Sequence, residues 1–264
     1  MSSPVAALTL LACGSMRFRW NETNAVRSAF FSLPYFRHKT IASVELIHSH
    51  IVFAADNSGQ TALQSGDGII SRNSALVPVI TVADCMPIFM YESKSGVFGV
   101  LHSGWKGTGI ALEALRTAEK AYGARADNFR FILGPSIGSC CYTVDEERAR
   151  YFQKEFCTDC VSRSERDGLF RLSLEKANRA LLVKAGIPDE HILSVNECTC
   201  CTKTENGAYT YGSFRRQASG LPSSMPLEEK TKHFTPMAAF IGFEDADFTR
   251  ENLHAAGVQT YVFR

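Results

Sequence analysis

The stretch from Ala75 to Tyr91 is the longest apolar run in the chain, and it limits what the chain can fold into. A membrane-spanning helix needs about 20 mostly apolar residues. This run is interrupted by Pro78, Asp84 and Pro87, so we expect strands in its place. A proline cannot donate to a sheet ladder, which indicates a bulge or a sheet edge at this point.

The end of this run and the next apolar run are predicted to pair as an antiparallel hairpin around a polar loop at Glu92–Gly96. This pairing sets Met86 opposite His102 and puts Cys85 beside that histidine, because cross-strand neighbours are only about 5 Å apart. A thiol beside an imidazole suits a nucleophile with its base. It equally suits two ligands of a soft or borderline metal such as zinc. A buried thiol near a hydrogen-bonded histidine is the structural alternative.

A catalytic zinc ion needs a third protein ligand, and His48 and His50 are the candidates. They are two residues apart and would share one face of a strand. Two histidines and one cysteine leave the fourth position open for water or substrate. Asp84, next to Cys85, is a candidate for orienting a histidine or moving a proton, or it caps a bulge.

Two further residues are candidates for contact with a substrate. Lys106 lies between glycines just before a predicted helix, where backbone N–H groups can approach an anion. Asp67 precedes Gly68 in a predicted turn and is either a turn residue or a site residue.

Helical periodicity alternates with the strand patterns, which predicts an α/β or α+β domain. The expected helices are Thr108–Tyr122, capped by Thr108, one that begins at Asp145 with Ala149, Phe152 and Phe156 on its apolar face, and Ser173–Ala185 with Leu174, Ala177, Leu181 and Ala185 on its face. The segment Phe214–His233, rich in Gly, Pro and Ser, is expected to be a loop or flexible insertion. Val5–Gly14 is expected to contain a first strand rather than a secretion signal, because no basic residue precedes it.

Composition excludes several classes of protein. Apolar residues make up 45% of the chain, which is ordinary for a globular protein and excludes a disordered one. The formal charge is 28 − 27 = +1, so we expect no nucleic-acid partner. We also expect no membrane partner.

The nine cysteines are an odd number and include two directly adjacent pairs. This pattern suits reduced thiols or metal ligands in the cytoplasm better than a disulfide framework. Cys157 and Cys160 form a CxxC motif, and together with Cys198, Cys200 and Cys201 they are candidates for a closed four-cysteine zinc site.

Several segments resemble the ordered motifs of the YfiH family, the laccase-domain or multicopper polyphenol oxidoreductase proteins. The matching segments are IHSHIV, SGDGIIS, TVADCMPIFM, GVLHSGWKGT and GPSIGSCCYTV, within roughly residues 40–215. The resemblance implies a mixed α/β fold, layered α/β/β/α, shared distantly with the catalytic domain of cytotoxic necrotizing factor. It implies one domain over residues 1–264 with a divergent N-terminus (1–39) and a divergent C-terminal segment (217–264).

The resemblance also implies an activity. Family members are regarded as zinc-dependent purine nucleoside phosphorylases that act on adenosine, inosine, guanosine and 5′-methylthioadenosine and also deaminate adenosine. His48, Cys85 and His102 would be the zinc ligands and the catalytic residues, while His50 falls on a variable position. Lys106 and Asp67 would contact the nucleoside or phosphate.

The sequence departs from the family pattern in places that bear on substrate preference and rate. RFRWNET stands where the family has TTRxGG, Leu46 stands where it has Gln, and Lys106 stands where it has Arg. Lysine keeps the charge but loses the planar bidentate donor. After Arg216 a longer, different tail replaces the usual ending.

Three other functions are consistent with the residues. The first is a metal-independent hydrolase, such as a peptidoglycan-precursor editing amidase, with Cys85 as nucleophile and His102 as base. The second is a copper polyphenol oxidase with Cu²⁺ ligands, which the seven histidines of the chain supply poorly. The third is a non-enzymatic binding module in which the thiols hold structural zinc.

Overall fold

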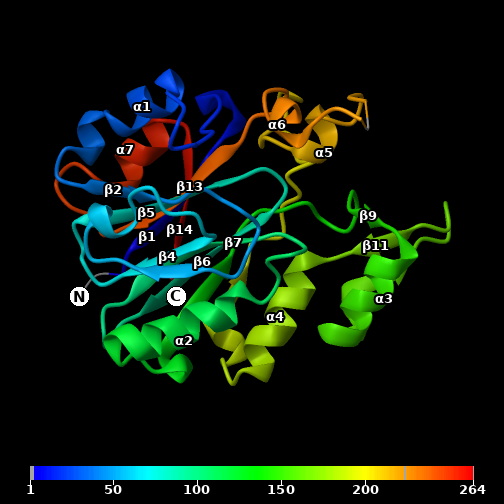
Figure 1. Cartoon of the computed structure of the whole chain (residues 1–264), viewed down its shortest axis with the longest axis horizontal. Coiled ribbons are helices and arrows are strands. Elements are labelled where there is room, and N and C mark those ends of the chain that lie inside the picture. Colours follow the sequence, from blue (N-terminus) through cyan, green and yellow to red (C-terminus); the bar gives the residue numbers. More distant parts are fainter. Residues whose placement is uncertain (1–2, 223, 264) are drawn as a thin grey trace.

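Two stacked β-sheets form the centre of the computed structural model, and helices cover both outer faces (Figure 1). The structure describes residues 3–222 and 224–263. The strands are β1 (Val5–Thr9), β2 (Thr40–Ser43), β3 (Val52–Ala54), β4 (Gly68–Ser71), β5 (Leu76–Val82), β6 (Met86–Glu92), β7 (Phe98–Ser103), β8 (Phe129–Leu133), β9 (Thr143–Val144), β10 (Val161–Arg163), β11 (Phe170–Leu172), β12 (Ile192–Ser194), β13 (Met237–Gly242) and β14 (Val258–Val262). The α-helices are α1 (Ala25–Phe31), α2 (Ile110–Tyr122), α3 (Glu146–Glu155), α4 (Leu174–Lys184), α5 (Phe214–Gln217), α6 (Leu227–Lys230) and α7 (Arg250–Ala255). Short 3₁₀ turns lie at Leu11–Cys13, Pro34–Phe36, Ser58–Gln60, Ala126–Asn128, Thr158–Cys160 and Asp189–His191.

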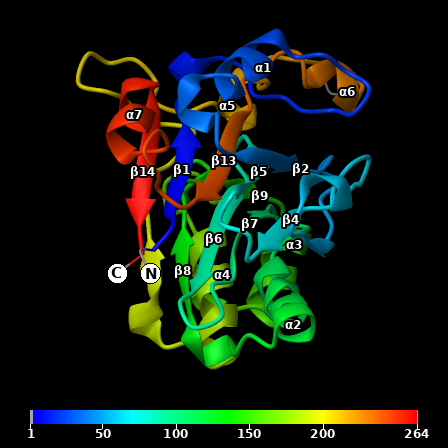
Figure 2. The ribbon, with the colours of Figure 1, turned by 90° about the vertical axis from the view of Figure 1, so that its left-hand side faces the viewer.

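Within the described residues, one sheet has the order β14-β1-β13-β5-β2 and the other has the order β12-β8-β6-β7-β4-β3. A small third sheet has the order β10-β11-β9. Both large sheets mix parallel and antiparallel pairs, since β2 runs parallel to β5 and β12 runs parallel to β8. The turned view separates the two large sheets, with α1 and α7 on one side and α2 and α4 on the other (Figure 2).

Three apolar layers hold these elements together. Leu8, Phe89 and Ile241 belong to the layer between the two large sheets. Phe30 and Phe240 belong to the layer under α1 and α7, and the buried faces of α2 and α4 pack on the six-stranded sheet. The expected α/β/β/α layering is therefore confirmed.

The two divergent ends of the chain build one sheet together. β1 pairs antiparallel with both β13 and β14, so three of the strands in its sheet come from the chain termini. The expected first strand is confirmed over Val5–Thr9.

The hairpin is confirmed, but the predicted register was wrong by one residue. Pro87 pairs with His102 and Met86 pairs with Ser103. The strand extends to Glu92, whose carboxylate accepts hydrogen bonds from the backbone N–H groups of Lys94 and Ser95 and shortens the loop. β6 lies inside its sheet rather than at an edge. Pro87 is tolerated because it lies near the start of the strand, before the pairing with β8 begins.

The three long helices are confirmed, with corrections at their ends and faces. Asp145 and Ser173 cap α3 and α4 by accepting hydrogen bonds from backbone N–H groups. Thr108 is not a cap, because its hydroxyl donates to the Gly104 carbonyl and the helix begins at Ile110. In α4, Leu182 lies on the buried face, whereas Leu181 is half-buried and Ala185 is exposed, contrary to the predicted face.

The prediction that Phe214–His233 forms a loop was wrong in part, because α5 and α6 lie within it. Ser213 caps α5 by accepting a hydrogen bond from the Arg216 N–H. Ser223, which the same prediction included, lies outside the described residues. Over residues 3–222 and 224–263, none of the helices has the length and apolar character needed to cross a bilayer.

Candidate active site

Cys85 lies where the chain passes from one large sheet to the other, between β5 and β6. The residue before it, Asp84, has a left-handed backbone with φ 79°. Its carboxylate accepts hydrogen bonds from the Thr199 hydroxyl at 2.7 Å and the Arg215 N–H at 2.6 Å. Its carbonyl accepts a third from the Ile137 N–H at 2.9 Å. These contacts tie the turn to later loops, so the prediction that Asp84 orients a histidine is not supported by its contacts.

His102 is held near the end of β7 by Asp67, which is fully buried. The ring Nδ1 lies 2.9 Å from the carboxylate Oδ1, and the His102 N–H donates to the Asp67 carbonyl at 2.7 Å. Asp67 also accepts from the backbone N–H of His48 at 3.0 Å and from both the N–H and the hydroxyl of Ser49. Because Asp67 is fully buried and its carboxylate is engaged by His48, Ser49 and His102, it is placed to position the site.

His48 lies on a bend with φ 59°, not on the predicted strand. His48 leaves the strand conformation because its backbone N–H donates to Asp67 and is not available to a sheet ladder. The bend turns the His48 ring edge-on to His102, with 4.9 Å between ring centres. Among the described residues, His50 does not belong to a cluster of metal-ligand side chains.

The three predicted ligand side chains come together. One ligand atom from each of His48, Cys85 and His102 lies within 4.8 Å of the other two. Gly104 makes room for them, since a Cβ at this position would lie 2.7 Å from the Cys85 sulfur. Two imidazoles and a thiol with space for a fourth ligand fit a catalytic metal ion.

The electrostatics of the site couple the thiol and the imidazole. Burial raises the pKa of Cys85, but the charge of His102 and hydrogen bonds from both histidines outweigh it and bring the pKa to about 6. Burial lowers the pKa of His102, while the Cys85 thiolate and Asp67 together raise it to about 10. The metal-free site therefore favours a thiolate beside an imidazolium, and a metal ion would displace the imidazolium proton.

A cavity of about 130 Å³ opens over the three ligand side chains. Residues that the sequence reasoning missed form much of its wall, among them Arg17, Phe18 and Arg19 from the N-terminal segment and Phe234 from the C-terminal segment. They lie in the two divergent regions, and the signal for the first three was that RFRWNET departs from the family pattern. Over the described residues, the cavity lining includes neither Lys106 nor Asp67. Lys106 lies instead against Trp105, with its Nζ 5.4 Å from the ring centre.

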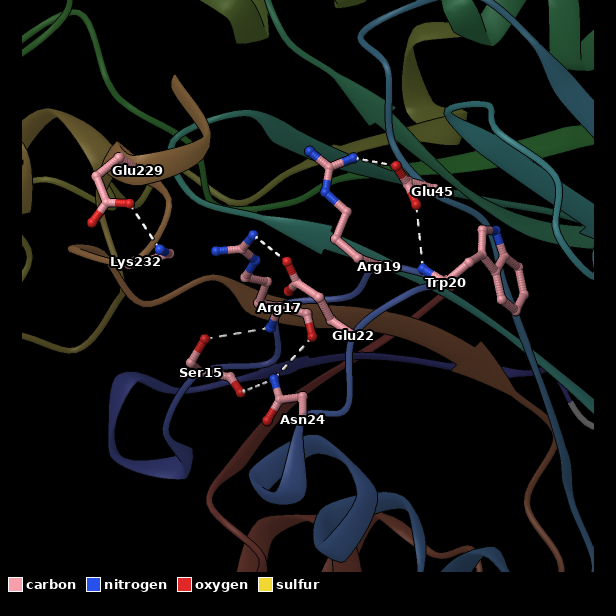
Figure 3. Close-up of polar contacts among 9 residues, drawn as sticks. All are labelled: Ser15, Arg17, Arg19, Trp20, Glu22, Asn24, Glu45, Glu229 and Lys232. Atoms are coloured by element: carbon pink, nitrogen blue, oxygen red, sulfur yellow. Dashed lines mark hydrogen bonds and ion pairs between the residues drawn. The ribbon is translucent and has the colours of Figure 1, made fainter. Parts of the chain in front are cut away.

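The arginines are held by acidic partners at the cavity wall (Figure 3). Arg17 donates to Glu22 at 2.8 Å, and Arg19 donates to Glu45 at 2.6 Å. Glu45 also accepts from the backbone N–H of Trp20 at 3.2 Å. Within the described part of the chain, the buried Nε of Arg17 has no hydrogen-bond partner.

The predicted set of clustered thiols was right for Cys198 and Cys201 but wrong for Cys157, Cys160 and Cys200. Cys160 donates to the Cys157 carbonyl at 2.7 Å, beside α3, and neither belongs to the cluster found in the structure. That cluster consists of Cys140, Cys141, Cys198 and Cys201. These four thiols meet because β12 lies beside β8 in the sheet, which brings the loops after the two strands together.

Comparison with known proteins supports the resemblance found in the sequence. Residues 21–221 match the family described as multi-copper polyphenol oxidoreductase laccase. The chain belongs to this family. The fold agrees with that of the YfiH protein of Bacillus licheniformis, with a TM-score of 0.74 at 24% identity over 92% of this chain and 97% of that one. It also agrees with YlmD of Geobacillus stearothermophilus, with a TM-score of 0.75 at 23% identity over 92% and 93% of the two chains.

Curated relatives of this family member carry names of nucleoside-processing enzymes. Adenosine deaminase RL5, from an unknown prokaryotic organism, is 34% identical over 55% of this chain and 56% of its own length. Purine nucleoside phosphorylase YlmD of Geobacillus stearothermophilus is 31% identical over 53% of each chain. The chain thus spans about half the length of these two relatives. A purine nucleoside phosphorylase of Borreliella burgdorferi is 30% identical over 69% of this chain and 78% of its own length.

Proposed function

We propose that this protein is a zinc-dependent purine nucleoside phosphorylase that acts on adenosine, inosine, guanosine and 5′-methylthioadenosine and also deaminates adenosine. The observation that carries the proposal is the convergence of His48, Cys85 and His102 beneath a cavity lined by two arginines. The names of the relatives support a nucleoside as the substrate.

In this proposal the two imidazoles and the Cys85 thiolate hold the zinc ion. When bound, zinc supplies a Lewis acid and an open coordination position. Asp67 holds Nδ1 of His102, which fixes the ring and leaves Nε2 for the ion. The same carboxylate fixes the backbone at His48 and so orients two ligands at once.

The other residues of the cavity bind the two substrates. Arg17 and Arg19 line the cavity and supply positive charge for phosphate. Phe18 and Phe234 offer apolar surface to the purine ring. In phosphorolysis a phosphate oxygen forms a bond to C1′ of the ribose while the bond from C1′ to the purine nitrogen breaks. The purine leaves with the bonding electrons and takes up a proton, giving free base and ribose 1-phosphate.

The remaining features of the proposal are simpler. Purine nucleosides and phosphate are its partners, with neither nucleic acid nor membrane involved. A cytoplasmic location agrees with the nine cysteines, which are all free thiols.

The direct experiment follows adenosine with purified, zinc-loaded protein, with and without phosphate. We expect phosphate-dependent adenine and ribose 1-phosphate, together with some inosine from deamination, and no product from His102→Ala. His50→Ala is the matched control and should retain activity, because His50 lies outside the cluster. Absence of product from folded, zinc-loaded protein at every phosphate concentration would reject the proposal.

A metal-independent cysteine hydrolase is the second candidate, and the lowered pKa of Cys85 beside His102 is the observation in its favour. It makes an opposite prediction for chelation. Amidase activity that survives complete removal of metal but is lost in Cys85→Ser would support the hydrolase. Activity that is lost on chelation and restored by zinc would support the phosphorylase.

A further inference from the structure

Four cysteines from two separate loops meet on the far side of the turn that carries Cys85. Cys140 and Cys141 follow β8, and Cys198 and Cys201 follow β12. Their four sulfur atoms all lie within 4.8 Å of one another. Cys198 is buried, whereas Cys140 and Cys201 reach the surface.

The sulfur positions suit a tetrahedral ion better than a disulfide. With a Zn–S bond of about 2.3 Å, tetrahedral geometry separates sulfur atoms by about 3.8 Å. The Cys140 and Cys201 sulfur atoms are 3.6 Å apart. A disulfide requires about 2.05 Å, so the two atoms would have to move much closer to bond.

The backbone around the thiols is shaped to receive a charged sulfur. The Gly138 N–H donates to the Cys198 sulfur at 3.2 Å, which favours the thiolate. A Cβ at Gly138 would crowd the thiols, since it would lie 3.2 Å from the Cys140 sulfur and 3.2 Å from the Cys198 Cβ. Each loop makes a tight turn: the Cys141 N–H donates to the Gly138 carbonyl at 2.9 Å and the Cys201 N–H donates to the Cys198 carbonyl at 3.3 Å.

The two loops are joined independently of the thiols. The Thr199 N–H donates to the Ser136 carbonyl at 3.0 Å, and Ser136 forms a parallel bridge with Cys198. Arg216 donates to the carbonyls of Thr199 and Cys200 at 2.9 and 2.7 Å. The four sulfur atoms are therefore brought together by contacts of the folded chain itself.

We infer that Cys140, Cys141, Cys198 and Cys201 form a second metal site, which binds a structural zinc ion through four thiolates. Four sulfur ligands close the coordination sphere, so this ion would have no open position for a substrate. The site lies beside the catalytic turn, because Thr199 and Ile137 both bind Asp84. A zinc ion there would clamp the loops that fix the position of Cys85.

The test counts metal ions per chain by elemental analysis and native mass spectrometry after purification with zinc present. We expect two zinc ions in the wild type and one each in Cys140→Ser and Cys85→Ser. Cys157→Ser is the matched control and should keep both ions, since Cys157 lies outside both clusters. Substitution of the second ion by Co²⁺ should give the sulfur-to-metal charge-transfer absorption of a tetrathiolate, and Cys140→Ser should lose it.

The outcomes separate this inference from the proposed function. Loss of zinc only from the Cys85→Ser variant, with an unchanged zinc count in Cys140→Ser, would overturn the second site and leave the first intact. A Cys140–Cys201 disulfide in the purified protein, or iron in place of zinc, would also overturn it. Two zinc ions in a protein without nucleoside activity would support the second site and reject the proposed function.

A measurement on the wild-type protein tests the second metal site even if the variants fail to fold. Alkylation mapped by peptide mass spectrometry should find Cys201, an exposed member of the cluster, protected until a chelator is added, with Cys157 as the reference thiol. Equal alkylation rates of Cys201 before and after chelation would contradict the inference.

Discussion

In each of the two clusters of ligand side chains the donor atoms lie within 4.8 Å of one another, but the chain supports the two clusters differently. His48, Cys85 and His102 come from three segments distant in sequence and are backed by the buried carboxylate of Asp67. The four-thiol cluster takes its donors from two loops and is supported by backbone N–H groups and a glycine. The first opens to a cavity, and the second would be closed by its own ligands. A site whose fourth ligand must come from solvent or substrate can do chemistry, whereas a site whose four ligands all come from the protein can only stabilise the fold. The source of the fourth ligand therefore matters more than the number of thiols.

Removing the thiol of the open site should have the largest effect on activity. Cys85→Ala deletes a metal ligand, and we expect phosphorolysis to fall to background together with the loss of one zinc ion. Cys140→Ser, in the closed cluster, should retain measurable turnover. Equal losses of turnover in the two variants, measured as kcat/KM, would break the distinction between the clusters.

The thiols of the two clusters should also differ in reactivity once metal is removed. The pKa of Cys85 is lowered to about 6, so above pH 6 this thiol is mainly thiolate. Burial and the neighbouring thiols raise the pKa of Cys140 to about 12, so it stays protonated up to high pH. At pH 7.5 the larger thiolate fraction of Cys85 outweighs its lower intrinsic nucleophilicity, and we expect its alkylation to be about 30–100-fold faster than that of Cys140. Similar rates at this pH would contradict the electrostatic account of the open site.

Weakening the support of the open site should cost less than removing a ligand. Asp67→Asn removes the charge that holds the His102 ring, and losses of about 10–100-fold in zinc affinity or activity are typical of such partners. Zinc titration and the activity of zinc-saturated protein measure the two effects separately. The four-thiol site should keep its zinc in this variant, and loss of both ions would indicate a general disruption of the fold.

The smallest of these effects is expected at the cavity wall. Arg17→Gln removes a charged donor, and a hydrogen bond to a charged group contributes about 1.5–3 kcal/mol, so we expect KM for phosphate to rise about tenfold or more. Deamination of adenosine, which needs no phosphate, should change little. Arg116→Gln, an exposed position on α2, is the control. A similar loss in deamination would show that Arg17 maintains the structure of the cavity and does not bind phosphate.

The parts of the fold that local pattern determines could be predicted from the sequence. The apolar runs at β6 and β7 gave the hairpin and the proximity of Cys85 to His102, although Glu92 shifted the register by one residue. The helix starts at Asp145 and Ser173 could be predicted for the same reason. The short α5 and α6 were missed because Gly, Pro and Ser dominate their segment, and a single helical turn leaves little periodicity.

The parts that long-range contacts determine could not be predicted. The residue pattern left His48 and His50 as equal candidates, and only the family resemblance chose His48, since its bend depends on the distant Asp67. Arg17 lines the cavity together with Thr81 and Val82 of β5, a proximity that no local pattern indicates. The CxxC motif at Cys157 drew attention by its spacing, whereas the actual thiol cluster depends on β12 lying beside β8.

The most direct test of the central claim is a titration of metal-free protein with zinc, followed by release of adenine from adenosine in the presence of phosphate. We expect no adenine before zinc is added, a rise in rate that follows occupation of the His48–Cys85–His102 site, and no recovery in His102→Ala at any zinc concentration. Full activity of the metal-free protein, lost in Cys85→Ser, would contradict the account and assign the site to cysteine chemistry without a metal.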